Sequence, residues 1–287
     1  MQIDMVVAYV DNQDKVWRKT YFDYVNKRNI WHIADNISGG RFKDIGLINY
    51  QLKLIEKNMP FVNKIYLLVS NIEQVPLGIN KNKVIPVLHK DFIPVEYLPT
   101  FNSTTIEMFL WNIPNLSEYF IYANDDMIPV GKMEESDFFT KEGKIKISFL
   151  HDTLVRNDSN FKYQCLNSYL HVMDKLFKKT ENNLDFIRPI HSFTPIIKSH
   201  AQECYLSLSS YINKYVWAFR TKYQHNQYIY PIWEHEKYGT LESTIDFMYT
   251  EEAKEEDFHY QILCINRVKT KENGDLIISE LNNLLNN

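Results

Sequence analysis

Two adjacent carboxylates, Asp125 and Asp126, directly follow an apolar run from Tyr119 to Ala123. Adjacent like charges repel, so such a pair at the end of a strand needs a cation or solvent to neutralise it. Hard divalent ions such as Mg²⁺ prefer oxygen ligands, and usually bind one or two carboxylates together with substrate phosphates. The pair therefore favours a metal site at the edge of an active site, while a solvated turn explains the dipeptide about equally well.

A second candidate lies at the start of a predicted helix, in the segment 98–107. Its Asn102 and Ser103 are good helix-capping residues, and the free N–H groups at a helix N-terminus suit phosphate. Glu107 would lie in the first turns of the same helix. Plain capping by Asn102 or Ser103 is the commoner reason for an isolated pattern of this kind, so it stays as the alternative.

His191 and Arg220 are candidates for proton transfer and for charge stabilisation. His191 lies in a loop bounded by Pro189 and Pro195, and an imidazole in such a loop can act as a general base near neutral pH. Arg220 lies among aromatic residues, and a buried arginine often binds phosphate or carboxylate. The alternatives are a packing or surface role for His191 and an exposed, ring-stacked Arg220.

Several function classes leave no signal in the sequence. There are 8 glycines and no glycine-rich phosphate loop, nucleophile elbow or dinucleotide motif. The net charge is −4 without a long basic run, which argues against nucleic-acid binding. The three cysteines, Cys165, Cys204 and Cys264, predict reduced thiols in a cytosolic protein, not a disulfide framework or a zinc site. We expect no signal peptide and no transmembrane helix.

The elements that must position these candidates alternate between strand and helix over the first part of the chain. Four apolar, β-branched runs predict strands: 3–10, 64–69, 83–88 and 119–123. Pro86 favours an edge position for the third of them. Helical signals predict helices at 45–57 and 104–112. The order indicates an α/β fold with a mostly parallel sheet and flanking helices.

In a sheet of this kind, ligands bind beyond the carboxyl ends of the strands. Asp11 and Asp14 follow the first predicted strand, just as Asp125 and Asp126 follow the fourth. The two acidic loops would meet at one edge if these strands are neighbours. The second half of the chain is less regular; there we expect a helix at 199–215, a short strand at 261–266 and an amphipathic helix at 276–287.

Taken together, these segments resemble the Stealth family of sugar-1-phosphate transferases in bacterial capsule synthesis, which includes the lysosomal-enzyme N-acetylglucosamine-1-phosphotransferase. The similarity runs in order along the chain, and several ordered blocks are more specific than any one motif. The segments similar to the first two family blocks are 3–17, 41–71, 98–107, 116–131 and 136–144. Segments 191–199 and 219–224 resemble the third block, and 262–268 a degenerate fourth.

The resemblance implies a nucleotide-sugar-binding core of the GT-A-like type over residues 1–150, and a helical or irregular portion over 151–287 that completes one compact catalytic unit. Such a transferase moves a sugar-1-phosphate from a UDP-sugar to a glycan hydroxyl, forms a phosphodiester and releases UMP. The expected cofactor is Mg²⁺ or Mn²⁺, and no nucleic-acid partner is expected. We expect a cytoplasmic protein, with a lipid-linked acceptor and attachment to the inner face of the membrane left open.

The resemblance also implies roles for single residues. Asp126, helped by Asp125, would hold the metal on the diphosphate, and Arg220 would stabilise charge on the transferred phosphoryl group. His191 would take the acceptor proton, while Glu107 would orient His191, the acceptor or a metal-bound water. Six residues would contact substrate: Asp11, Asp14, Arg41, Asn102, Ser103 and Lys198.

The chain departs from the family pattern in three places. Different residues flank Asp11, and the stretch 47–50 lacks a glutamate and an arginine that the family usually has. Where the last block normally ends in Asn-Asp, Asn266 and Arg267 stand, which questions a late acidic residue. An ordinary metal-dependent UDP-sugar glycosyltransferase and a non-catalytic glycan-binding protein are therefore kept as alternatives.

Overall fold

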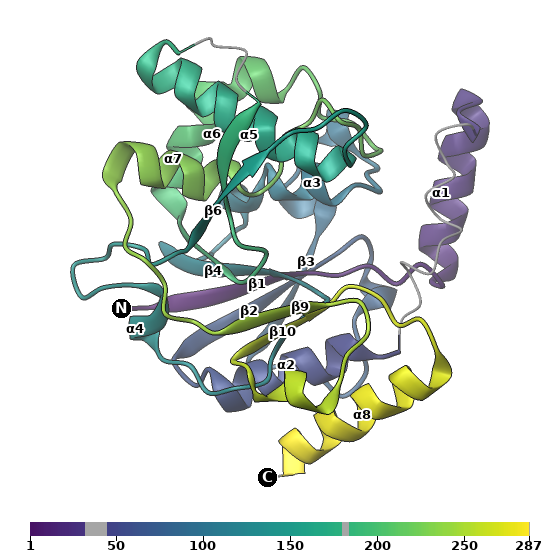
Figure 1. The fold of residues 1–287 in the computed structure, drawn as a ribbon. Helices are drawn as coiled ribbons and strands as arrows, with labels where there is room; N and C mark the ends of the chain where they lie inside the picture. Colours follow the sequence, from purple (N-terminus) through teal and green to yellow (C-terminus); the bar gives the residue numbers. More distant parts are fainter. Residues whose placement is uncertain (32–44, 180–183, 287) are drawn as a thin grey trace.

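A computed structural model describes residues 1–31, 45–179 and 184–286. Its centre is a five-stranded sheet in the order β3-β2-β1-β4-β8 (Figure 1). Four of the strands are parallel: β1 (Ile3–Ala8), β2 (Val62–Val69), β3 (Val84–Leu88) and β4 (Tyr119–Asn124). The edge strand β8 (Thr194–Ile197) runs antiparallel to β4. The mostly parallel sheet confirms the predicted α/β class with a GT-A-like core.

A charged residue, Asp4, interrupts the apolar run of β1 and is nevertheless fully buried. Its carboxylate accepts hydrogen bonds from Asn63 Nδ2 at 2.9 Å and from the backbone N–H groups of Lys64 and Ser117 at 3.1 and 2.8 Å. A buried charge is tolerated where its oxygens are bonded in this way. Asp4 thereby ties β1 to the start of β2 and to the segment that leads into β4.

Helices cover both faces of the sheet, because alternate residues of its buried strands point into two separate apolar clusters. Below the sheet in Figure 1 lie α2 (Leu47–Asn58) and α8 (Lys271–Asn286). Above it lie α3 (Ser103–Glu107), α5 (Asn160–Phe177), α6 (Lys198–Ile212) and α7 (Ile229–Tyr238). Helix α1 (Lys15–Arg28) follows β1, and its Trp17 and Tyr21 pack against Phe101.

Two smaller sheets complete the fold. Strands β5 (Met127–Pro129), β10 (Ile262–Ile265) and β9 (Phe247–Thr250) form one, and β6 (Phe149–Thr153) pairs with β7 (Asp185–Pro189) in the other. The short helix α4 (Glu135–Phe138) follows β5. Because β8 pairs with β4 and β10 pairs with β5, strands from the second half of the chain build on strands from the first half.

Most of the predicted elements are present, including β3 at the edge with Pro86. The helix predicted over 104–112 is wrong in length, since α3 ends at Glu107 and only a 3₁₀ turn, Leu110–Asn112, follows. Pro114 explains why the 3₁₀ turn stops at Asn112, because the residue before a proline disfavours helical backbone, and Ile113 is extended. The apolar side of α8 is buried against α2 and β5.

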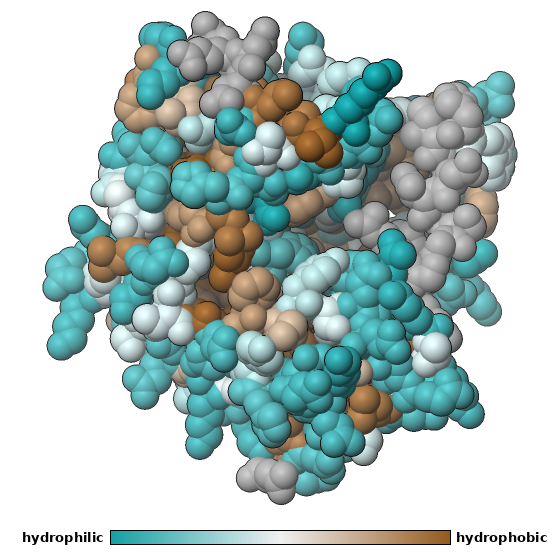
Figure 2. Space-filling model, in the orientation of Figure 1, coloured by the Kyte–Doolittle hydropathy of each residue, from teal (hydrophilic) through white to brown (hydrophobic). Residues whose placement is uncertain are grey.

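The exposed face in Figure 2 is mostly hydrophilic, with scattered hydrophobic areas and a hollow between the helices above and strands β9 and β10 below. Scattered apolar residues of this kind are normal on a protein surface. Of the helices in the described part of the chain, none is both long enough and apolar enough to cross a membrane.

Candidate active site

The Asp125-Asp126 turn lies at the carboxyl end of β4, where the chain leaves the central sheet and enters β5. Strand β1 is the parallel neighbour of β4, with Ala8 paired to Asn124. The loop that carries Asp11 and the turn that carries Asp126 therefore lie at the same edge of the sheet. The strand adjacency on which the sequence argument depended is confirmed.

The Asp turn is held in place from two directions. Gln51, fully buried on α2, donates from Nε2 to the backbone oxygens of Asn124 at 2.8 Å and Met127 at 2.6 Å. From β10, the backbone N–H of Ile265 donates to the backbone oxygen of Asp126 at 2.9 Å. These bonds fix the backbone on both sides of the two carboxylates, so the turn presents them in a defined position.

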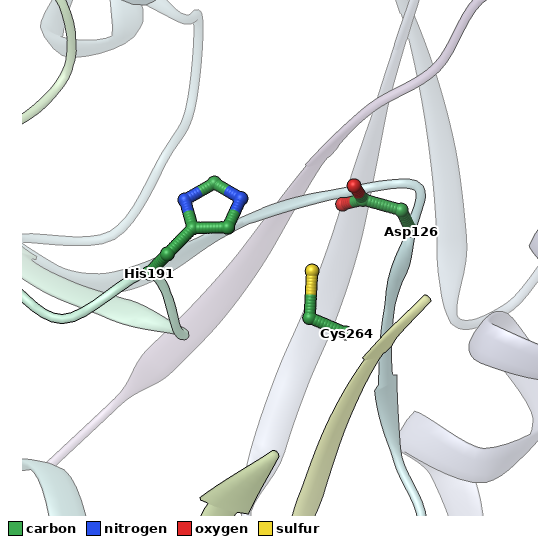
Figure 3. Close-up of side chains that lie close together, drawn as sticks. All are labelled: Asp126, His191 and Cys264. Atoms are coloured by element: carbon green, nitrogen blue, oxygen red, sulfur yellow. The ribbon is translucent and has the colours of Figure 1, made fainter. Parts of the chain in front are cut away.

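Three side chains converge beside this turn: Asp126, His191 from the loop between β7 and β8, and Cys264 from β10 (Figure 3). One oxygen, one nitrogen and one sulfur atom of the three lie within 4.8 Å of one another. Nδ1 of His191 is hydrogen-bonded to the Tyr228 hydroxyl at 2.8 Å. In Figure 3 one ring nitrogen lies on the side of Asp126, and because Nδ1 is engaged by Tyr228, this atom is Nε2.

Burial controls the protonation of this cluster. It lowers the pKa of His191, against the opposing effect of the Asp126 charge, so the imidazole is neutral at neutral pH. Burial, followed by the charge of Asp126 and a hydrogen bond to it, raises the pKa of the Cys264 thiol well above its usual value. A neutral imidazole has a lone pair that can accept a proton or bind a metal ion.

Asp125 and Asp126 together fit a hard divalent cation by ligand type. Burial, then the charge of Glu107 and those of Asp125 and Asp126, raise the pKa of Tyr122. Burial, then Asp126 and Asp125, raise the pKa of Cys264, so both carboxylates act on the same two groups. Carboxylate oxygens at a fixed strand end are the ligands that Mg²⁺ and Mn²⁺ prefer. These two residues are the ones that would hold such an ion.

Glu107 lies on the other side of the site and is only 3% exposed. Its Oε2 accepts a hydrogen bond from the backbone N–H of Gln227 at 2.9 Å, and hydrogen bonds from the Ser103 and Tyr122 hydroxyls act on the same carboxylate. Burial raises the pKa of Glu107, while the positive charge of Arg220 and these bonds oppose the rise. Arg220 donates from Nη2 to Ser103 Oγ. Ser103 therefore links the guanidinium to the buried carboxylate.

A polar but buried segment follows Arg220 in the chain. Its members are Gln224, His225, Asn226 and Gln227. Gln224 accepts from Asn102 Nδ2 at 3.1 Å and from the backbone N–H of Thr221 at 2.8 Å, and it donates to the backbone oxygen of Phe219 at 3.1 Å. Asn102 also caps α3. The Asn102 side chain thus joins the start of α3 to the loop that carries Arg220.

The two sides of the site meet in this segment. Glu107 binds the backbone N–H of Gln227, and the next residue, Tyr228, binds Nδ1 of His191. The structure thus gives an indirect link between Glu107 and His191, through Gln227 and Tyr228. A run of four polar residues between Tyr223 and Tyr228 is the sequence signal that could have found this segment. Gln227, Tyr228 and Tyr122 are not among the predicted site residues.

The remaining predicted substrate residues are placed differently. Asp11 and Asp14 lie in the loop after β1, where Asp11 accepts from the backbone N–H of Gln13 at 2.8 Å and Asp14 caps α1. Lys198 lies near the amino end of β4, away from Asp125 and Asp126 at its carboxyl end. The reason is that β8 runs antiparallel to β4, and its last residue, Ile197, pairs with the first residue of β4. The structure therefore does not bring Lys198 to the site. Arg41 lies outside the described residues.

The chain is similar in sequence to proteins of one family. The family pattern of Stealth protein CR2, conserved region 2, matches residues 41–147, which include Glu107, Asp125 and Asp126. The receptor polysaccharide phosphotransferase WefC of Streptococcus gordonii is 31% identical over 255 residues, covering 88% of this chain and 69% of that protein. The chain belongs to the Stealth family. The name of WefC describes that protein as a receptor polysaccharide phosphotransferase.

Two other relatives of this Stealth protein match a shorter stretch. The capsular polysaccharide phosphotransferase eps5J of Streptococcus thermophilus is 38% identical over 154 residues, 53% of this chain and 63% of the relative. The exopolysaccharide phosphotransferase cps2G of Lactiplantibacillus plantarum is 36% identical over 156 residues, 53% of this chain and 44% of the relative. The chain thus spans less than two thirds of the length of these two relatives.

Proposed function

We propose that this Stealth protein transfers a sugar-1-phosphate from a UDP-sugar to a hydroxyl of a glycan, in the synthesis of capsular or other cell-surface polysaccharide. The product is a phosphodiester, and UMP leaves. One observation carries the proposal: Glu107, Asp126, His191 and Arg220 come from four separate segments and gather around the carboxyl end of β4. The names of the relatives, which are polysaccharide phosphotransferases, support it.

In this proposal His191 is the general base. In the tautomer whose Nδ1–H donates to the Tyr228 hydroxyl oxygen, which this role requires, Nε2 has a lone pair on the side of Asp126. The lowered pKa keeps the imidazole neutral, so Nε2 can take the proton of the acceptor hydroxyl. The acceptor oxygen forms a bond to the phosphorus that carries the sugar, the bond from that phosphorus to the bridging oxygen breaks, and UMP departs with the bridging oxygen.

Arg220 stabilises the negative charge on the transferred phosphoryl group. Phosphoryl transfer depends mainly on positioning and on electrostatic stabilisation, so a fixed cation is more useful than a mobile one. The bond from Arg220 to Ser103 and the nearby charge of Glu107 hold the guanidinium. Glu107, being buried, acts as a positioning residue for Arg220 and, through Gln227 and Tyr228, for His191.

Asp126, with Asp125, would hold Mg²⁺ or Mn²⁺ against the donor diphosphate. When bound, the ion supplies neutralisation of phosphate charge. The loop with Asp11 and Asp14 lies at the same edge of the sheet, where the nucleotide would bind. We place the reaction in the cytoplasm; a lipid-linked acceptor would bring the protein to the inner face of the membrane.

The test is a panel of UDP-sugars with a glycan acceptor and Mg²⁺ or Mn²⁺, in which the released nucleotide is identified. Release of UMP, dependent on the acceptor, is the expected result. Release of UDP would replace the proposal by ordinary glycosyl transfer, in which the sugar carbon is attacked and the whole diphosphate leaves. Glycan binding without turnover of any donor would replace it by a binding protein.

A further inference from the structure

Cys264 has no part in the proposed transfer, although its thiol lies beside the residues that carry it. Cys264 pairs with Met127 across β10 and β5, and Met127 directly follows Asp126, so one strand pair holds both side chains. The thiol and the Asp126 carboxylate are hydrogen-bonded. Among the described residues, Asp126, His191 and Cys264 are the one set of three such side chains whose ligand atoms converge (Figure 3).

Carboxylate, imidazole and thiolate are the three side-chain ligands of Zn²⁺. In a tetrahedral site with bonds of about 2.0–2.3 Å, neighbouring ligand atoms are about 3.3–3.8 Å apart. The three atoms here lie within 4.8 Å of one another, so small side-chain rotations bring them to that spacing. Three protein ligands leave the fourth position open to water or another ligand.

We propose that Asp126, His191 and Cys264 form a binding site for a thiophilic divalent cation of the Zn²⁺ type. Cys264 binds as a thiolate, its proton passes to solvent, and the ion replaces the hydrogen bond between thiol and carboxylate. Mg²⁺ and Mn²⁺ prefer oxygen ligands and do not recruit the sulfur. The site therefore differs in its ligand set from the pair of carboxylates proposed for the hard cation.

Spacing along the chain gave no zinc signal, because the three ligands come from distant segments: the β4–β5 turn, the loop before β8, and β10. Only the pairing of β10 with β5, and the position of His191 just ahead of β8, bring them together. A regular motif of closely spaced cysteines and histidines is what a sequence search for zinc finds, and this site has none.

The inferred site has a consequence for transfer, and this consequence alone rests on the proposed function. An ion bound there occupies Nε2 of His191, the atom proposed as base, and engages Asp126, the residue proposed to hold Mg²⁺. Zn²⁺ would therefore inhibit transfer even when Mg²⁺ is in excess. The same three residues would make the activity responsive to thiophilic metals.

The direct test uses Co²⁺ as the probe, since a thiolate bound to Co²⁺ gives a charge-transfer absorption band in the near ultraviolet. The metal-free full chain, titrated with Co²⁺ alone, should develop this band and lose it when Zn²⁺ is added. Cys264→Ala should abolish the band. Cys204→Ala, which removes another buried thiol outside the cluster, should leave the band unchanged.

The result that overturns the site is a missing band in the wild-type chain, or a band that survives in Cys264→Ala. Should Cys264→Ala fail to fold, His191→Ala gives the second test, because loss of one of three ligands should weaken Co²⁺ binding at least tenfold; unchanged affinity contradicts the site. Neither readout needs donor or acceptor, so failure of the proposed transfer leaves the test intact.

Inhibition is tested separately, as the ratio of transfer rates with and without Zn²⁺. In the wild-type chain this ratio should fall at the Zn²⁺ concentration that removes the cobalt band. A transferring enzyme that binds Zn²⁺ at this site but keeps its full rate would contradict the inhibitory role.

Discussion

The two sides of the candidate site differ in what their side chains bind. On the Arg220 side, the side chains are bonded to other groups of the protein. Ser103 accepts from Arg220, Gln224 accepts from the backbone N–H of Thr221, and Glu107 accepts from that of Gln227. On the Asp126 side, the carboxylate, His191 and Cys264 bring ligand atoms of three kinds to one place. The first arrangement fixes a charge in advance, which is what stabilises a transition state without reorganisation. On the Asp126 side, the ligand atoms of the three side chains face one another, as in sites that exchange a proton or bind a cation.

The largest expected effect comes from the Asp126 side. His191→Ala should lower the transfer rate by about 10²–10⁴-fold, because a general base contributes that much, while donor binding stays largely intact. His151→Ala, at an exposed histidine on β6, is the matched control and should transfer normally. Steady-state kinetics and donor titration check both, and near-normal transfer by His191→Ala would remove this residue from the mechanism.

A smaller loss is expected on the Arg220 side. Arg220→Lys keeps the positive charge but loses the planar fork that binds Ser103 and, in the proposed mechanism, the phosphoryl group. We expect kcat to fall by about 10²–10³-fold, as for removal of one preorganised donor. Arg156→Lys, at an exposed arginine, should have no effect. Equal rates for Arg220→Lys and wild type would mean that the fixed geometry of this side does not matter.

A histidine away from both sides, His89, shows what burial alone does to an imidazole. Burial lowers the pKa of His89 to about 4, and its Nε2 has no hydrogen-bond partner in the described part of the chain. The unfolded chain binds this proton first, so the free energy of unfolding should fall as the pH drops from about 6.5 to about 4.

His89→Gln should remove about 2–3 kcal/mol of the loss in unfolding free energy between pH 7 and pH 4.5. Denaturant unfolding at the two pH values measures it, with the exposed His151→Gln as the control. An equal acid-induced loss in His89→Gln and wild type would show that this histidine is not buried in its neutral form.

The smallest effect concerns the link between the two sides. Tyr228→Phe removes one hydrogen bond to His191 Nδ1 and keeps the ring. Loss of a bond worth about 1.4 kcal/mol should lower kcat about tenfold with KM unchanged, since the base is misoriented while substrate contacts persist. Tyr223→Phe, at a residue with 54% exposure, is the control. A rise in KM without a change in kcat would assign Tyr228 to substrate binding instead.

The central strands could be predicted from the sequence because they are buried on both faces and therefore read as continuous apolar runs. Helix α1 could not, since only Trp17, Tyr21 and Val25 of its residues are buried and charged residues surround them. Helices α5 and α7 were missed for a related reason: they bury polar residues, among them Gln164 and Glu234, which blur the apolar period.

The site was predicted in part for the same physical reason. A carboxylate pair at the end of a buried strand is a local signal, and Asp125 and Asp126 carry it. The prediction that Lys198 belongs to the site is wrong, because β8 lies between His191 and Lys198 and runs from the carboxyl end of β4 to its amino end. The contact of Cys264 with Asp126 depends on the pairing of β10 with β5, which is a long-range event that no local pattern encodes.

The central claim is that phosphorus, with the sugar attached, moves to the acceptor. A UDP-sugar that carries a radioactive label on its β-phosphate tests this most directly, after incubation with the wild-type chain, glycan acceptor and Mg²⁺ or Mn²⁺. The account predicts that the label appears in the glycan as a phosphodiester and that the released UMP is unlabelled. Label found entirely in released UDP, with sugar but no phosphorus on the glycan, would contradict it.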